Sequence, residues 1–193
     1  GVINKHEGTN DMKALIIAAS LIALTQPAAA QSCPAEGDDA PLSLHKSWMM
    51  EGWERREGDP AFVFAEKMVR YYDLGSPRGV FYDNFAPGST QLFDNAAVYG
   101  ANWEGLQNGA RSVRHALTGG HDQLVGDDVA STTLGFVGTL TRRDGEVLAF
   151  DGRSQLGWAC TDDGWATTST TGTTPASPPT ATSSTTCCTT PAW

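Results

Sequence analysis

The sequence predicts an α+β domain in which a curved antiparallel sheet wraps around N-terminal helices. Two long alternating segments, residues 129–143 and 146–160, flank Asp144-Gly145, a dipeptide typical of tight type I′ hairpin turns. Strands of this length favour a bent sheet, and two apolar helical segments lie upstream of them for the sheet to cover.

A segment near the N-terminus is typical of an export signal. Residues 12–30 contain Lys13, then a short apolar run, then small residues that form a cleavage site. This pattern predicts cleavage after Ala30 and a secreted or periplasmic protein. A membrane anchor is the alternative, although the apolar run is about half the length of a bilayer span. Residues 1–11 form an upstream extension, and residues 31–41 form the start of the mature chain.

Residues 167–193 form a Thr/Ser/Pro-rich tail, with 12 Thr and 4 Ser among the 24 residues from 167 to 190. So little apolar area predicts disorder. The composition fits an O-glycosylated stalk or linker, but a corrupted reading frame, and with it a gene copy without function, fits as well. Residues 42–166 remain as one domain.

The mature chain from Gln31 has 20 acidic and 11 basic residues, a net charge of −9. This balance argues against nucleic acid and anionic membranes as partners. Cys33 and Cys160 are predicted to form a disulfide in an oxidising compartment, with Cys187 and Cys188 left to pair elsewhere. The cysteine spacing predicts no metal site, and no cofactor-binding motif is present.

Three helices are expected before the sheet. The first covers residues 43–57, and the second, residues 60–74, begins at the N-cap Asp59. The second helix has a wide apolar face made of Phe62, Phe64, Ala65, Met68, Val69, Tyr71 and Tyr72. The third helix covers residues 102–117 and ends at Gly119-Gly120.

Extended structure is expected from Val80 to Asp94 and at residues 123–125. A last strand should follow the Asp163-Gly164 turn at Trp165.

Several short motifs together resemble the nuclear transport factor 2-like superfamily, in particular its SnoaL-like branch. They are Phe93-Asp94, Trp103, Gly126-Asp127-Asp128-Val129-Ala130, Asp144-Gly145-Glu146-Val147, Trp158 and Asp163-Gly164-Trp165. The resemblance implies a cystatin-like cone with a pocket at its open end. Members of the family include both enzymes and non-catalytic domains, so the fold alone does not imply an activity. The family's last strand often carries His and Glu, whereas this chain has threonines there.

Asp94 is the candidate catalytic residue, because a carboxyl group buried in an apolar pocket can transfer protons near neutral pH. The alternative is that Asp94 forms a cap or an Asx turn with Asn95. Asp151 and Arg153 are candidate binding residues if Gly152 forms a bulge that turns one of them inward. Simple alternation instead places both on the outer face of the sheet, in solvent or at a subunit interface.

Tyr72, Tyr82, Tyr99 and Trp103 are candidate cavity residues, although aromatic residues at such spacing also form ordinary core. His115 is expected to be a solvated helix residue. We therefore expect an exported domain that binds or acts on a small hydrophobic molecule, with acid–base catalysis by Asp94 if it is an enzyme. The alternative is a non-catalytic domain that forms a homodimer through the polar face of its sheet.

Overall fold

The computed structural model describes residue 1 and residues 33–77, 79–83 and 91–171. The chain divides into two compact units, Gly1–Ala30 and Gln31–Trp193, and the helices and strands that the structure describes lie in the second. The predicted upstream extension, the signal segment and most of the tail lie outside the described residues. Within the described ranges, no helix has the length and apolar character needed to cross a bilayer.

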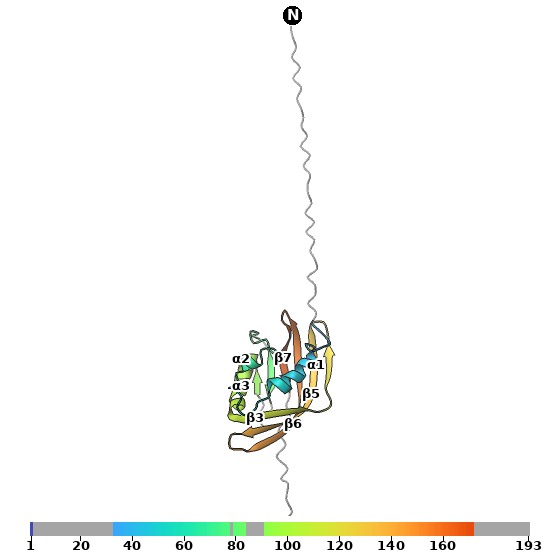
Figure 1. The fold of residues 1–193 in the computed structure, drawn as a ribbon. Coiled ribbons are helices and arrows are strands. Elements are labelled where there is room, and N and C mark those ends of the chain that lie inside the picture. The colour runs from blue at the N-terminus through green and yellow to red at the C-terminus, as the bar shows by residue number, and fades with distance from the viewer. Residues whose placement is uncertain (2–32, 78, 84–90, 172–193) are drawn as a thin grey trace, which may run out of the picture. The chain divides into compact units, whose positions relative to one another are not determined.

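The described residues form a seven-stranded curved sheet with helical segments against it (Figure 1). The strands are β1 (Val80–Asp83), β2 (Gln91–Phe93), β3 (Ala110–Leu117), β4 (Asp122–Val125), β5 (Val129–Arg142), β6 (Val147–Thr161) and β7 (Gly164–Thr171). Their order is β2-β1-β7-β6-β5-β3, and β4 also pairs with β5. The predicted α+β architecture is confirmed, but β1 and β7 pair in parallel, which the sequence did not indicate.

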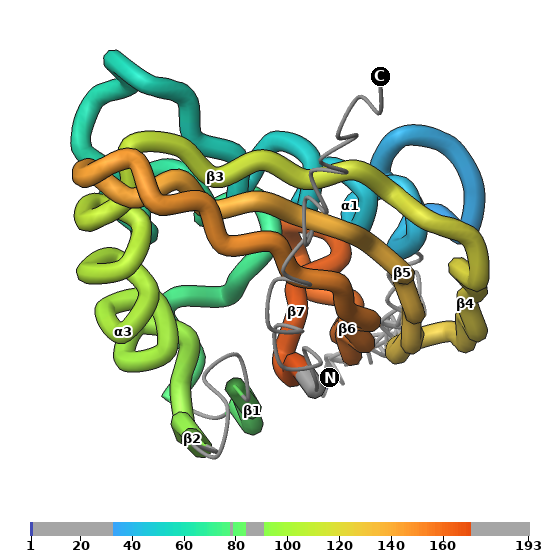
Figure 2. The backbone as a smooth tube through the Cα atoms, turned by 90° about the horizontal axis from the view of Figure 1, so that it is seen from below, coloured from blue at the N-terminus to red at the C-terminus, as the bar shows by residue number. Residues whose placement is uncertain are grey.

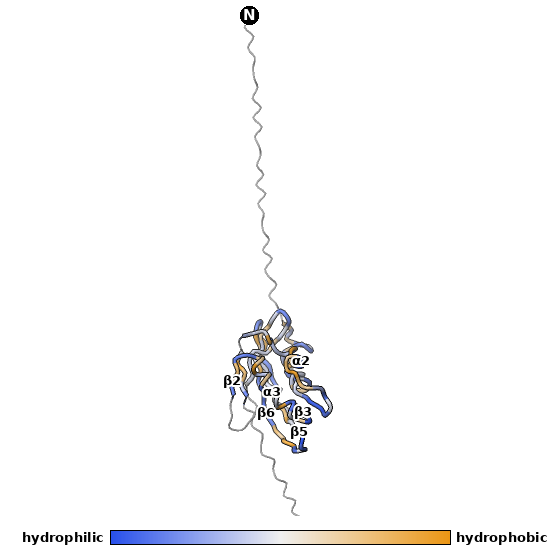
Figure 3. Tube along the Cα trace, turned by 90° about the vertical axis from the view of Figure 1, so that its left-hand side faces the viewer, coloured by the Kyte–Doolittle hydropathy of each residue, from blue (hydrophilic) through white to orange (hydrophobic). Residues whose placement is uncertain are grey.

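The predicted long hairpin is confirmed. β5 and β6 pair antiparallel from Val129 opposite Ala159 to Thr141 opposite Val147. Figure 2 shows β3, β5 and β6 curving together, with α3 near one end and β4 at the other. Hydropathy changes repeatedly along the strands (Figure 3), because one face of the sheet is buried and the other is exposed.

The turn of this hairpin differs from the predicted two-residue type I′ turn. Gly145 has φ +94°, whereas no residue other than glycine has a positive φ in the described chain. Gly145 N–H donates to Arg142 O at 3.1 Å, and Arg142 N–H donates to Glu146 O at 2.8 Å. The connection is therefore a three-residue loop in which only the glycine adopts the left-handed conformation.

The first predicted helix is shorter than expected and changes type. It consists of α1 (Pro41–Ser47) followed by a π-helical turn, η1 (Trp48–Gly52). It ends at Trp53, whose N–H donates to Trp48 O at 3.1 Å.

The second predicted helix is wrong apart from one turn, α2 (Phe64–Lys67). Asp59 does not cap it but accepts a 2.7 Å hydrogen bond from Arg56 N–H within a turn. Beyond this turn the segment joins β7, because Tyr71 O accepts a 2.7 Å hydrogen bond from Thr167 N–H. The segment is nevertheless buried: Phe62, Phe64, Met68, Tyr71 and Tyr72 are all core residues, while Val69 is exposed.

The third predicted helix is wrong at both ends. α3 covers Ala96–Gly109, and Asn95 caps it by accepting a 2.9 Å hydrogen bond from Val98 N–H. The chain then becomes strand β3, which pairs with β5 from Ala110 to Leu117. The spacing of Val113 and Leu117 fits a helical period and a strand period equally well, and pairing with β5 decides between them.

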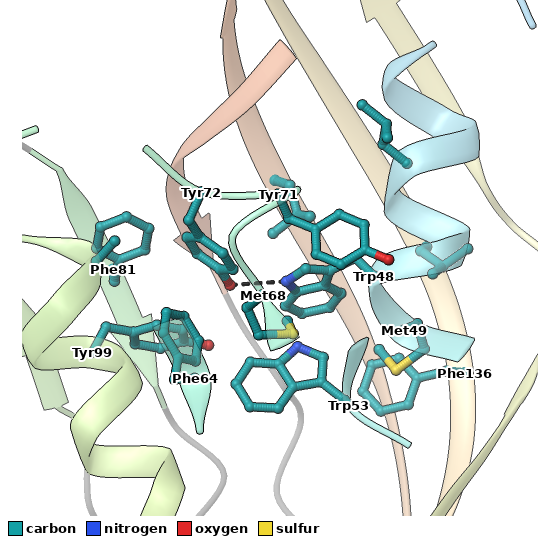
Figure 4. Close-up of a cluster of buried hydrophobic side chains, with 14 of the residues drawn as sticks. Trp48, Met49, Trp53, Phe64, Met68, Tyr71, Tyr72, Phe81, Tyr99 and Phe136 are labelled. Atoms are coloured by element: carbon teal, nitrogen blue, oxygen red, sulfur yellow. Dashed lines mark hydrogen bonds between the residues drawn. The ribbon is translucent and has the colours of Figure 1, made fainter. Parts of the chain in front are cut away.

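The core lies between the concave face of the sheet and the helical segments. Figure 4 shows aromatic and sulfur-containing side chains packed together, with Trp48 Nε1 donating to Tyr72 Oη at 2.8 Å. Met68, Leu134 and Leu156 are completely buried. Helix α3 approaches this core closely at Gly100, where an added Cβ would lie 2.1 Å from the ring of Phe64.

The predicted disulfide is confirmed, because Cys33 and Cys160 are bonded at 1.99 Å. The last predicted strand also forms, as β7. It runs to Thr171, past the domain boundary expected after Ala166. Threonines here are strand residues, not tail: Thr167 and Thr170 are buried, and Thr167 Oγ1 donates to Gly157 O at 3.0 Å.

Candidate functional site

A cavity of about 60 Å³ lies against the concave face of the sheet. It is lined by Trp48, Met49, Trp53, Tyr82, Asp83, Tyr99, Trp103, Leu106, Gln107, Val113, His115, Phe136, Leu140, Phe150, Ser154 and Thr170. Most of these side chains are apolar or aromatic, with a few polar groups among them. A cavity of roughly 150 Å³ accommodates benzene, so this one takes only a molecule of a few non-hydrogen atoms or the end of a larger one.

His115 and Glu54 form a hydrogen-bonded pair at the wall of the cavity. His115 Nδ1 lies 3.2 Å from Glu54 Oε1, and the backbone N–H of His115 donates to the same oxygen. Arg114 Nε lies 2.8 Å from Glu54 Oε2. The side chains of His115 and Glu54 are only 6% and 12% exposed, so the pair is largely shielded from water.

The backbone fixes this pair in place. Arg55 and Val113 exchange two hydrogen bonds of 2.9 Å, which joins the chain after η1 to strand β3. Alternation along β3 then points Val113 and His115 into the cavity, and Glu54 precedes the bridge by one residue. The carboxylate therefore lies behind the imidazole, away from the cavity lining.

Burial lowers the pKa of His115, while the charge and hydrogen bond of Glu54 act in the opposite direction. The imidazole is therefore mostly neutral at pH 7. Because a carboxylate only accepts hydrogen bonds, the ring proton resides on Nδ1, which leaves the Nε2 lone pair available. The ring packs edge-on against Phe136 and Phe150, at centroid distances of 5.9 and 5.7 Å.

Tyr99 and Asp83 are further titratable groups of the cavity wall. Burial, followed by the nearby charge of Asp83, raises the pKa of the Tyr99 phenol. Asp83 ends β1 and is 8% exposed. Tyr99 thus stays protonated over the physiological range and can act as a hydrogen-bond donor.

Two buried polar atoms on the wall have no hydrogen-bond partner among the described residues, Trp53 Nε1 and Gln107 Oε1. Gln107 is 2% exposed, and its Nε2 donates to Trp53 O at 3.2 Å. An unsatisfied buried polar group costs about 1–3 kcal/mol. A bound molecule with a polar group is one way to recover that free energy.

The predicted cavity residues are brought together only in part. Tyr82, Tyr99 and Trp103 line the cavity. Tyr72 is buried behind them, with its ring centroid 6.2 Å from that of Tyr99, and is absent from the cavity wall.

Asp94 lies elsewhere, exposed in the connection between β2 and α3. Its Oδ1 accepts a 2.9 Å hydrogen bond from Asn95 Nδ2, and Asn95 is the helix cap. A surface carboxyl group lacks the burial that the predicted acid–base role requires, so we do not assign that role to Asp94.

Asp151 and Arg153 point away from the cavity. β6 has no bulge at Gly152, which lies opposite Phe136 in an unbroken register, so both side chains are exposed on the outer face of the sheet. Arg153 extends toward the loop at Gly120, where an added Cβ would lie 3.0 Å from Arg153 Nη2. Simple alternation along the strand, which places both residues on the outer face, is therefore correct. We do not assign Asp151 or Arg153 to the cavity.

No protein-family model matches this chain, and no curated protein does either. Several solved structures have similar folds at low sequence identity. One is a nuclear transport factor 2-like superfamily protein from Salmonella enterica, 20% identical, with a TM-score of 0.45 over 58% of this chain and 78% of that chain.

Two further structures superimpose over more of the chain. A candidate aromatic ring hydroxylase from Novosphingobium aromaticivorans is 17% identical, with a TM-score of 0.52 over 72% of this chain and 89% of its own. A candidate calcium/calmodulin-dependent protein kinase II association domain from Xanthomonas campestris is also 17% identical. Its TM-score is 0.50 over 77% of this chain and 94% of its own. The chain has the nuclear transport factor 2-like fold.

The nuclear transport factor 2-like fold explains why the polar groups of the cavity were not found from the sequence. His115 was placed on a helix, whereas the alternation of Val113, His115 and Leu117 was the signal that it points inward from a strand. Glu54 and Ser154 carried no signal at all, because only the folded sheet brings them to the cavity.

The described part of the chain has no group of three or more His, Cys, Asp or Glu side chains placed to hold a metal ion. The chemistry that the described groups support is proton transfer and hydrogen bonding in an apolar environment.

Proposed function

We propose that this domain binds a small, largely apolar molecule in the cavity and transfers a proton on it, with His115 as the base. The observation that carries the proposal is the pair of His115 and Glu54, held together at the wall of an apolar cavity. The fold alone does not choose an activity, because the same architecture serves many functions.

In the proposed reaction, His115 Nε2 takes a proton from a carbon or oxygen atom of the bound molecule. Glu54, hydrogen-bonded to Nδ1, stabilises the imidazolium that forms, and the ring then returns the proton to the same or another atom. Glu54 is a positioning residue here, because it touches His115 and not the cavity. Phe136 and Phe150 shield the ring from water, which strengthens its interaction with the carboxylate.

Nitroethane is a suitable probe, because it is small and has an acidic C–H bond. Loss of that C–H signal in D₂O, followed by NMR, reports proton abstraction directly. We expect the native protein to accelerate the exchange and His115→Gln to reduce that acceleration by about 100-fold, the lower limit for general-base catalysis. The matched control is His121→Gln, the same change at an exposed loop residue, which should leave the exchange unchanged. Equal exchange rates for the two variants would exclude His115 as the base.

We also infer that the domain works in a secreted or periplasmic location. The disulfide between Cys33 and Cys160 supports this, because such bonds persist mainly in oxidising compartments. The predicted cleavage after Ala30 gives a direct test: the mass of the protein recovered from its native host should correspond to a chain that begins at Gln31. An intact N-terminus, or a protein that stays in the membrane fraction, would contradict the proposal.

A homodimer is the second candidate, and the outer face of the β5–β6 hairpin favours it. Val137 is 42% exposed there, directly opposite Asp151, with Arg153 two residues further along the same face. Opposite charges close together on one face can pair reciprocally across a two-fold axis. This interface needs no catalytic cavity, so it corresponds to the non-catalytic alternative.

Analytical ultracentrifugation tests the homodimer. We expect Val137→Lys to shift the sedimentation coefficient to that of a monomer, because it places a charge in an apolar contact. Leu124→Lys, which changes a more exposed residue on β4, is the control. A native protein that sediments as a monomer at all concentrations would rule the interface out.

A further inference from the structure

A second hydrogen-bonded chain reaches the cavity, and it involves none of the groups used above. Trp158 Nε1 donates to Thr132 Oγ1 at 2.8 Å, and Thr132 Oγ1 lies 2.8 Å from His45 Nδ1. His45 Nε2 lies 2.7 Å from Ser154 Oγ, and Ser154 lines the cavity. All four residues are at least 95% buried.

The position of the chain relative to the cavity favours one direction for its donors and acceptors. The indole N–H of Trp158 can only donate, so Thr132 Oγ1 accepts from it. In each tautomer of the neutral ring, one hydroxyl proton has no acceptor among the described residues: that of Thr132 if Nδ1 donates, or that of Ser154 if Nε2 donates. Thr132 is 1% exposed and does not line the cavity, whereas Ser154 does. The spare proton costs less where a bound molecule can accept it, which favours Thr132 as the donor to Nδ1 and places the single ring proton on Nε2.

That tautomer decides the role of Ser154. His45 Nε2–H donates to Ser154 Oγ, so the hydroxyl proton of Ser154 is not used in this contact. Among the described residues, Ser154 Oγ has no other hydrogen-bond partner. Burial lowers the pKa of His45 to about 3, which keeps the ring neutral, so it carries only one proton.

We propose that Ser154 presents its hydroxyl proton to the cavity and binds an acceptor oxygen, such as a carbonyl, on the bound molecule. This inference rests on the proposed function, because it needs a cavity that takes a ligand, and it narrows the ligand class to small molecules with such an oxygen. Trp158, Thr132 and His45 are positioning residues that orient the hydroxyl.

The same direction excludes a tempting alternative. A serine beside a histidine resembles a nucleophile and its base, but a base must accept the proton of the serine. Here His45 donates to Ser154, so the hydroxyl is not activated for attack. The pair therefore acts in binding and not in covalent catalysis.

The tautomer can be measured without any ligand. In a long-range ¹H–¹⁵N NMR spectrum of the native protein, we expect a protonated Nε2 and an unprotonated Nδ1 for His45. His115 gives an internal contrast, because it should show the opposite pattern. A protonated Nδ1 in His45 would overturn the proposal.

Binding of two probes of nearly equal shape tests the ligand class. Butanone carries a carbonyl oxygen where 2-methyl-1-butene carries a methylene group. We expect Ser154→Ala to weaken butanone binding by about three- to tenfold, the equivalent of one hydrogen bond, and to leave the alkene unaffected. Ser131→Ala, the same change on the outer face of the adjacent strand, should affect neither probe.

The outcomes separate the two proposals. If the alkene binds and Ser154→Ala leaves the affinity for butanone unchanged, the role of Ser154 is wrong while the cavity stands. If neither probe shifts the resonances of cavity residues in the native protein, the proposed function fails, and the ligand class fails with it. If Ser154→Ala does not fold, the tautomer of His45 in the native protein decides the direction of the chain.

Discussion

Arg55 and Val113 exchange two backbone hydrogen bonds, each 2.9 Å long, between a segment after η1 and the middle of β3. This bridge places Glu54 beside His115 and beside Arg114 at once. The candidate acid–base pair therefore depends on a backbone contact between segments that are distant in sequence.

The charge of Glu54 should control the protonation of His115. Glu54→Gln removes the carboxylate that raises the pKa of His115, whereas the burial that lowers it remains. We expect the midpoint for His115 in an NMR pH titration to move to lower pH. A midpoint that did not move would show that Glu54 is not coupled to the imidazole.

His45 should make the folded state sensitive to acid. Its pKa is lowered from 6.5 to about 3, so the unfolded chain takes up this proton first as the pH falls. The stabilisation is complete above pH 6.5 and is lost between pH 6.5 and 3, by at most about 5 kcal/mol. Urea unfolding at several pH values should show a flatter decline for His45→Gln than for the native protein. Parallel declines would mean that His45 is protonated in the folded state.

Two glycines of α3 should respond oppositely to the same substitution. At Gly100 an added Cβ would lie 2.1 Å from the ring of Phe64, whereas Gly105 has nothing within 4 Å. We expect Gly100→Ala to lower the free energy of unfolding by roughly 1–3 kcal/mol through overpacking. Gly105→Ala should raise it by about 0.5–1 kcal/mol, because alanine favours a helix interior. Thermal and urea unfolding measure both, and equal effects would contradict the close approach of α3 to Phe64.

The disulfide should contribute substantially to stability. Cys33 and Cys160 are 127 residues apart, so the bond closes most of the domain into one loop. We expect the double change Cys33→Ala and Cys160→Ala to cost about 2–5 kcal/mol. Reduction of the native protein should reproduce this loss, and it should have no effect on the double variant.

The end of the folded domain should lie beyond Thr170. A chain that stops after Thr171 keeps the pairing of β7 with β6 and β1, and it should unfold cooperatively like the full chain. A chain that stops after Ala166 loses the buried Thr167 and Thr170 and should be much less stable. Equal stability of the two chains would place the boundary back at residue 166.

Local patterns predicted the parts of the fold that local rules determine. Asp144-Gly145 between alternating segments predicted the hairpin. Alternation along β6 placed Asp151 and Arg153 on the outer face of the sheet, which was the alternative to a binding role for them and is what the structure shows. Long-range pairing determined the rest. Residues 110–117 fit a helix or a strand until β5 pairs with them. Residues 68–72 likewise leave the expected helix and join β7, where Thr167 N–H donates to Tyr71 O.

The candidate site was less predictable than the fold. Tyr82, Tyr99 and Trp103 were identified because aromatic residues are conspicuous in a sequence. His115 was assigned to solvent because its element was assigned wrongly. The partners Glu54 and His45 gain a role only from side chains that the fold brings to them.

The parallel pairing of β1 with β7, in which Val80 lies opposite Ser169, also has a consequence for biosynthesis. The ribosome makes β1 long before β7. β1 therefore cannot pair with β7 until almost the whole domain has been synthesised. Completion of the sheet is therefore a late step, because contacts so distant in sequence form slowly. A chain stalled before residue 164 would leave β1 and β2 without their link to the remaining strands.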